Sequence, residues 1–100
     1  MPAIARLDDV STGHGPFPPT KMFVTPVTKT YFNGKLAGVK DAQCKFIVHN
    51  SGPVVHPAET RYPSQGASKT YIEGKLAVRI GDMLADGDAI SQGSPNTFIE

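Results

Sequence analysis

The chain has 100 residues and a formal charge of +1, and 39% of its residues are hydrophobic and 19% charged. This size predicts a single domain over residues 1–100 with a thin core and no extension domain. Ten glycines and nine prolines argue against a helical bundle, because proline breaks helix interiors. The near-neutral charge lacks the basic footprint of a nucleic-acid-binding protein. The single cysteine, Cys44, excludes a disulfide within the chain.

The start of the chain and its hydropathy bear on location. Residues 1–10 (MPAIARLDDV) lack the apolar segment of a secretory signal peptide. No apolar run is long enough to cross a membrane as a helix. We therefore expect the chain to be made in the cytoplasm.

Two β-hairpins are predicted from a repeated segment. Residues 29–37 (KTYFNGKLA) and 69–77 (KTYIEGKLA) are identical at seven of nine positions. An Asn-Gly pair between apolar residues is the strongest short hairpin signal, because both turn positions favour positive φ. The sequence therefore predicts hairpins with turns at Asn33-Gly34 and at Glu73-Gly74.

A third copy of the repeat is truncated at the C-terminus. Residues 92–100 (QGSPNTFIE) match residues 65–73 (QGASKTYIE), and the chain ends where the hairpin would turn. Three similar units can fold around a pseudo-threefold axis. We expect the unpaired last strand, ending at Glu100, to lie near the base formed by the hairpins.

The segments between the repeats are rich in Gly, Pro and Ser. Residues 13–20, 50–57 and 63–68 are predicted as ordered loops or extended backbone. No segment predicts a helix of ten or more residues. The fold class is therefore all-β, with a generic small β-sandwich as the alternative to a repeat fold.

One metal site is predicted from the residues that could supply nitrogen and sulfur ligands. His14, His49, His56 and Cys44 are the only histidines and cysteine, and all lie within residues 14–56. Three imidazoles and a thiolate would complete the tetrahedron of a structural zinc site. Iron could occupy the same set of ligands. The alternatives are a small buried cysteine in the core and histidines that face solvent.

The chain resembles the PAAR-repeat family along its whole length. The family's repeat is similar to residues 74–82 (GKLAVRIGD), and Gly13-His14-Gly15 and Gly93-Ser94-Pro95 also resemble family motifs. Leu76 and Val78 depart from the name-giving Pro and second Ala. The copy at residues 35–41 lacks the arginine and is one residue shorter.

The resemblance implies a conical β-hairpin fold with a metal near its vertex, held by His14, Cys44, His49 and His56. Family members cap a trimeric β-helical spike in type VI secretion systems and contractile phage tails. The resemblance thus implies a monomeric tip protein, one copy per spike trimer, that contacts a target membrane transiently. It would leave the cytoplasm as part of the secretion apparatus or the virion tail.

Two other classes of function are weighed against a spike tip. A metal hydrolase needs an open coordination position and a general base, whereas the predicted site has four protein ligands and no nearby glutamate in the sequence. A small zinc-stabilised module that binds nucleic acid or protein is the other alternative. The dispersed Lys and Arg residues argue against nucleic acid as its ligand.

Overall fold

Four two-stranded antiparallel sheets make up the regular structure of the computed structural model, which describes residues 1–100. The strands are β1 (Met22–Val24), β2 (Tyr31–Phe32), β3 (Lys35–Leu36), β4 (Lys45–Phe46), β5 (His49–Ser51), β6 (Val54–His56), β7 (Tyr71–Ile72) and β8 (Lys75–Leu76). The only helical segment is a 3₁₀ turn, η1 (Ala58–Thr60). The predicted all-β class is confirmed. No helix in this structure has the length and apolar character needed to span a membrane.

Both predicted hairpins are confirmed. β2 pairs with β3 and β7 pairs with β8, each closed by a two-residue turn. Asn33 and Gly34 have φ values of 57° and 78°, and Glu73 and Gly74 have 52° and 85°. Positive φ at both central residues is typical of the type I′ turn, whose twist matches that of the paired strands.

The two ends of the chain form a third pairing of the same kind. The backbone N–H of Ile4 donates to the Thr97 carbonyl at 3.0 Å, and that of Ile99 donates to Pro2 at 2.9 Å. In the same way, Ala37 donates to Thr30 in the first hairpin. The last strand therefore has a partner, which the prediction from the sequence missed: the N-terminal segment supplies it.

A closed ring of backbone hydrogen bonds joins the three repeats. Ala5 donates to Val78 at 2.9 Å, Val78 to Gly38 at 3.3 Å, and Gly38 to Ala5 at 3.0 Å. These residues occupy equivalent places after their respective pairings. The ring is compatible with a threefold arrangement of the repeats, while the symmetry of the whole chain stays a prediction.

Side chains at one equivalent position of the three repeats, which is the first turn residue of each hairpin and the last residue of the chain, tie the three pairings together. Each of them contacts the segment that leads into another repeat, so the contacts again run in a cycle. They are Asn33 to Asn96 at 3.1 Å, Glu73 to Thr30 at 2.9 Å, and Glu100 to Thr70 at 2.6 Å.

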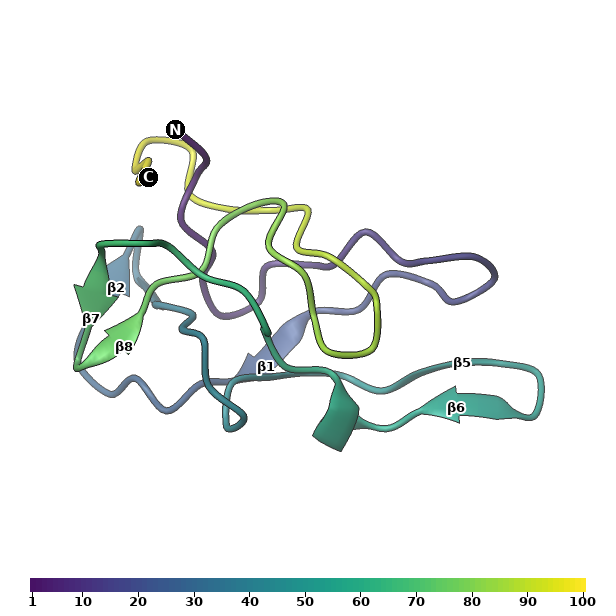
Figure 1. The fold of residues 1–100 in the computed structure, drawn as a ribbon. Coiled ribbons are helices and arrows are strands. Elements are labelled where there is room, and N and C mark those ends of the chain that lie inside the picture. The colour runs from purple at the N-terminus through teal and green to yellow at the C-terminus, as the bar shows by residue number, and fades with distance from the viewer.

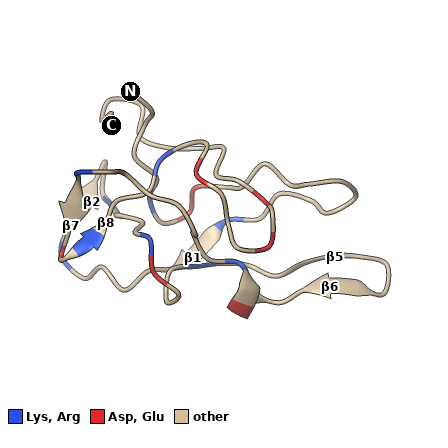
Figure 2. Cartoon of the chain, in the orientation of Figure 1, with Lys and Arg blue, Asp and Glu red and all other residues tan.

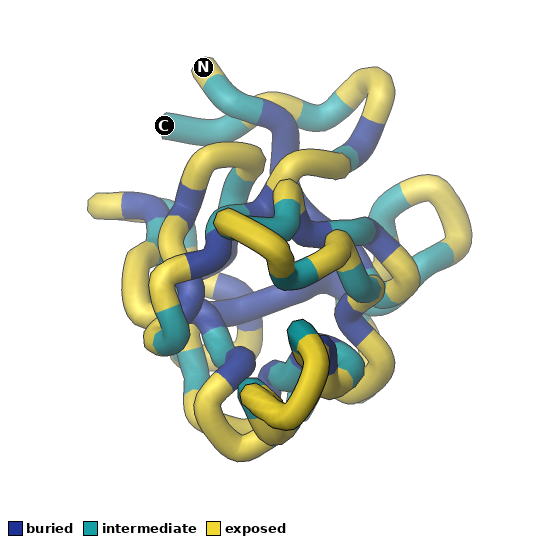
Figure 3. The backbone as a smooth tube through the Cα atoms, turned by 90° about the vertical axis from the view of Figure 1, so that its right-hand side faces the viewer, coloured by how far each residue is buried: buried dark blue, intermediate teal, exposed yellow.

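The hydrophobic core lies between the repeats and the β1–β4 pair. It contains 13 buried residues, among them Ile4, Val39, Phe46 and Val78. In a view along the long axis, buried segments run through the middle and exposed loops surround them (Figure 3). None of the 13 core residues lies in 10–20 or 47–58.

The molecule is elongated, with principal extents of 38 × 24 × 22 Å. β2, β7, β8 and both termini lie toward one end, which we call the hairpin end (Figure 1). Residues 10–20 and 47–58 extend to the opposite end, which we call the loop end (Figure 1). Residues 50–57 were expected to be ordered loop or extended backbone, and the sequence analysis did not foresee that β5 pairs with β6 there. Gly52, with φ of 58°, begins their turn, and the fixed φ of Pro53 suits the next position.

Candidate metal centre

The three histidines meet at the loop end through one nitrogen each. His49 Nε2 lies 3.2 Å from His14 Nε2 and 3.0 Å from His56 Nδ1. In a tetrahedral site with metal–nitrogen distances of about 2.0–2.1 Å, neighbouring ligand atoms are about 3.3 Å apart. The spacing of the three nitrogens therefore fits one shared metal ion.

Asp86 supplies a fourth candidate ligand that the sequence did not predict. Its Oδ2 lies 3.3 Å from both His49 Nε2 and His56 Nδ1. The four candidate ligand atoms all lie within 4.8 Å of one another. The arrangement could thus hold a metal ion with three imidazoles and one carboxylate.

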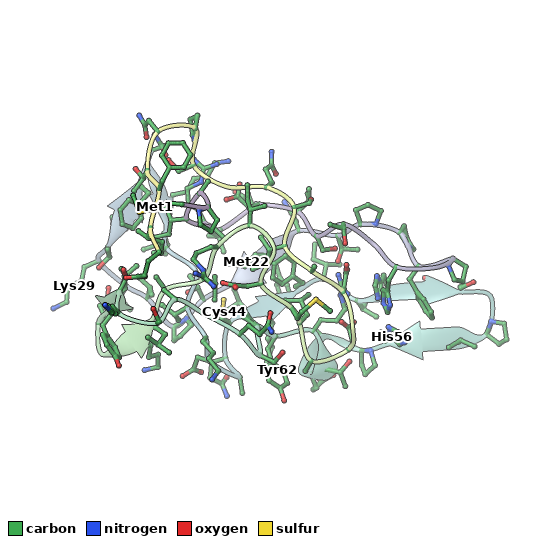
Figure 4. All side chains as sticks on the ribbon, turned by 45° about the horizontal axis from the view of Figure 1, so that its top comes forward. Met1, Met22, Lys29, Cys44, His56 and Tyr62 are labelled. Atoms are coloured by element: carbon green, nitrogen blue, oxygen red, sulfur yellow. The ribbon has the colours of Figure 1, made fainter.

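Cys44, the predicted fourth ligand, does not belong to this cluster. It is fully buried in the core, and its Sγ lies 3.6 Å from Met22 Sδ. Figure 4 shows Cys44 beside Met22 in the body of the molecule, well away from His56. Burial raises the pKa of the Cys44 thiol to about 11. The four side chains that the fold brings together are His14, His49, His56 and Asp86, so the predicted set is corrected to one with Asp86 in place of Cys44.

Strand pairing brings two of the histidines together. His49 begins β5 and His56 ends β6, and they are direct partners in the antiparallel register. Paired residues project from the same face of a sheet, with Cβ atoms about 5 Å apart. The hairpin that the sequence analysis missed is therefore what brings these two imidazoles to one site.

His14 reaches the site through a tight turn. Its backbone N–H donates to the Phe17 carbonyl at 3.1 Å, and Phe17 donates back at 2.9 Å. Gly13 precedes the turn with φ of 75°, and a Cβ there would lie 2.7 Å from the Phe17 carbonyl oxygen. A side chain at Gly13 would therefore break the turn that presents His14.

Hydrogen bonding sets the ring state of His49. Its Nδ1 lies 2.9 Å from the Pro18 carbonyl oxygen, which can only accept. The Nδ1 therefore carries the proton, and in the neutral ring Nε2 keeps a lone pair directed at the cluster. A carbonyl that orients a ligating histidine in this way is common in metal sites.

Phe17 packs against the histidines. Its ring stacks on His56 with centroids 4.0 Å apart and on His14 at 5.1 Å. It also lies 4.9 Å from the His49 ring. Phe17 thus limits the rotation of all three rings, although nothing in the sequence marked it as part of a site.

The carboxylate of Asp86 is held ionised by its neighbours. Burial alone would raise its pKa, but hydrogen bonds from Arg61 and the Asp88 backbone, with the Arg61 charge, hold the pKa below its ordinary value. Arg61 Nη1 lies 2.8 Å from Asp86 Oδ2. Asp86 is therefore an anion at neutral pH, as a metal ligand must be.

Replacement of Cys44 by alanine separates the predicted ligand set from the observed one. We expect Cys44→Ala to keep the metal content of the wild type and to lose about 1 kcal/mol of stability, because only a buried sulfur is removed. Asp86→Ala, its matched comparison, should lower the metal content. Elemental analysis and thermal melts measure both. A metal-free Cys44→Ala variant beside a metal-loaded Asp86→Ala variant would restore the thiolate as the ligand.

The candidate site offers three nitrogen atoms and one oxygen atom to a metal ion. Asp86 and Arg61 were missed because each lies in a loop sequence that carries no spacing signal; the Asp-Gly-Asp run at 86–88 was the only local sign.

Comparison of the chain with protein-family models and with curated proteins gave no match.

Proposed function

We propose that this chain is a non-enzymatic tip that caps a trimeric β-helical spike, as PAAR-repeat proteins do in type VI secretion systems and contractile phage tails. One copy would bind each trimer through the hairpin end. The loop end would then lead into the target membrane. A structural zinc ion would hold the loop end together.

The observation that carries this proposal is an aromatic residue exposed at the same position of each repeat. Tyr31, Tyr71 and Phe98 are 58%, 64% and 51% exposed. Each follows the equivalent threonine, and the residue after it turns toward the core. Exposed aromatic side chains are enriched at protein interfaces. A surface that repeats three times on one chain matches a partner made of three identical chains.

The loop end supports the proposed contact with a membrane. Residues 10–20 and 47–58 contain no Asp, Glu, Lys or Arg, and both segments lack charged residues in Figure 2. Val54 and Val55 are more than half exposed there. Charged side chains are costly in the hydrocarbon layer, so an uncharged end enters it more easily. Basic and acidic residues are interspersed over the rest of the chain (Figure 2).

Zinc is the metal that we propose for the cluster. Imidazole and carboxylate ligands at tetrahedral spacing are typical of zinc sites. Iron accepts the same ligand types, so elemental analysis of the protein purified without added metal decides between them.

Binding to a spike tests the proposed function directly. We expect the chain to bind the trimeric β-helical spike protein encoded in the same genome, with one chain per trimer by native mass spectrometry. The triple variant Tyr31→Thr, Tyr71→Thr, Phe98→Thr should weaken this binding at least tenfold, because it removes the repeated aromatic surface while keeping residues that favour strands.

The matched control is Val54→Thr with Val55→Thr, which changes equally exposed apolar residues at the loop end. This control should bind the spike as the wild type does. If the wild type ignores the spike but shifts a DNA fragment at moderate salt, the chain is instead a zinc-stabilised binding module.

A further inference from the structure

A buried arginine organises the metal cluster. Arg61 follows η1 and is 0% exposed. Its Nη1 has two N–H groups, which can donate to Asp86 Oδ2 at 2.8 Å and to Asp88 Oδ2 at 3.1 Å. Nη1 also lies 2.9 Å from His49 Nε2, whose single lone pair is then left for a metal ion. A guanidinium this deeply buried is costly unless each N–H finds an acceptor, so its placement is strongly constrained.

The rest of the guanidinium binds the segments that carry the histidines. Its Nε donates to the Ile47 carbonyl at 2.8 Å, two residues before His49. Its Nη2 donates to Thr20 Oγ1 at 2.6 Å and Ser11 Oγ at 3.2 Å, which flank the loop that carries His14. The Arg61 side chain thus joins the loop that carries His14, the segment that carries His49, and the loop that carries Asp86.

Asp88 balances the charge of this arginine. It is 1% exposed, and its Oδ1 accepts from Thr12 Oγ1 at 2.9 Å and from the Ala89 backbone at 2.7 Å. With one carboxylate offsetting Arg61, the second carboxylate, Asp86, keeps its negative charge for a metal ion. Without Asp88, the arginine and a divalent ion would compete for a single anion.

The Asp86 carboxylate has few other contacts. Its Oδ1 accepts from the Asp88 backbone N–H at 3.1 Å, and its Oδ2 accepts from Arg61. Oδ2 has two lone pairs, so it can accept from Arg61 and still face the histidine nitrogens. Residues 85–88 form a loop that contributes no strand to any sheet.

We propose that Arg61, balanced by Asp88, is the positioning residue that makes Asp86 the fourth ligand and closes the coordination sphere. Without it, the metal would keep three histidines and take water in the fourth position, which is the arrangement of open zinc sites. This inference rests on the metal site in the proposed function, and it does not depend on the spike.

Cobalt substitution tests the inference, because the visible spectrum of Co²⁺ responds to its ligands. We expect the spectrum of the wild-type protein loaded with Co²⁺ to ignore added azide, since all four positions are protein ligands. In Arg61→Met the spectrum should respond to azide, as it should in Asp86→Ala, the reference with three histidines. Loss of an outer contact of this kind typically weakens metal affinity 10–100-fold.

Two further variants guard against a general folding defect. Arg61→Lys keeps the positive charge and replaces the three guanidinium nitrogens by one ammonium nitrogen, so it should restore part of the affinity. Asp88→Asn is used if Arg61→Met does not fold, and it too should make the spectrum sensitive to azide. Circular dichroism checks that each variant is folded.

Specific results overturn the inference. One is a folded Arg61→Met, or a folded Asp88→Asn in its place, that keeps the wild-type cobalt affinity and ignores azide. A wild-type protein that binds no Co²⁺ overturns both this inference and the proposed metal, whereas the spike-binding measurement would be unaffected. Failure of spike binding, with the cobalt results as expected, rejects the spike and leaves the role of Arg61 standing.

Discussion

Removal of the metal by a chelator is expected to lower the melting temperature by roughly 15–30 °C. An ion present at about 1,000 times its dissociation constant stabilises the folded state by about 4 kcal/mol, and each kcal/mol shifts the melting temperature of a domain of this size by about 4–8 °C. The effect is large because the loop end contributes nothing to the hydrophobic core, which leaves hydrogen bonds and the metal to hold it. None of the 13 core residues lies in residues 10–20 or 47–58.

His49→Ala should reproduce the effect of the chelator and remove any further response to it. The ligating nitrogen of His49 lies within 3.3 Å of those of both other histidines and of Asp86 Oδ2. Asn50→Ala is the matched control, because Asn50 is exposed on the same strand. Calorimetry with and without chelator, together with elemental analysis, measures the result. If the chelator removes the metal from the wild type and the melting temperature does not change, the prediction is contradicted.

The local parts of the fold could be predicted because their signals are short. Asn33-Gly34 and Glu73-Gly74 adopt positive φ at both turn positions, as the repeated sequence predicted. The third pairing was missed because its two strands lie at opposite ends of the chain, around Ala3 and Phe98. The repeated sequence shows that the third copy lacks its second strand. The folded chain shows that the N-terminal segment takes the place of that strand.

The candidate site was predicted in part for a related reason. The three histidines are the only imidazoles in the chain, which made them the candidate nitrogen ligands, and the β5–β6 pairing places two of them side by side. Cys44 was included because sulfur is a common zinc ligand, but its small apolar side chain suits the core equally well. Asp86 is one of nine acidic residues, and its role follows from Arg61, which lies 25 positions earlier.

Deletion of residues 97–100 is the second change expected to have a large effect. It removes the backbone hydrogen bonds that join Thr97 to Ile4 and Ile99 to Pro2, and the partial burial of Ile99 against the core. At about 1 kcal/mol for each hydrogen bond and about 1 kcal/mol for the isoleucine, the loss is about 3 kcal/mol. Glu100 also ceases to accept from Thr70, so the cycle of contacts between the repeats opens.

Phe98→Thr is the control for this deletion, because the Phe98 side chain is half exposed and its backbone pairing persists. It should keep the wild-type stability within about 0.5 kcal/mol, as expected for a surface position. Urea unfolding at neutral pH compares the three proteins. Equal stability of the deletion variant and the wild type would mean that the chain ends do not close the third pairing in solution. The first two hairpins would then have to hold the ring of Ala5, Gly38 and Val78 together without it.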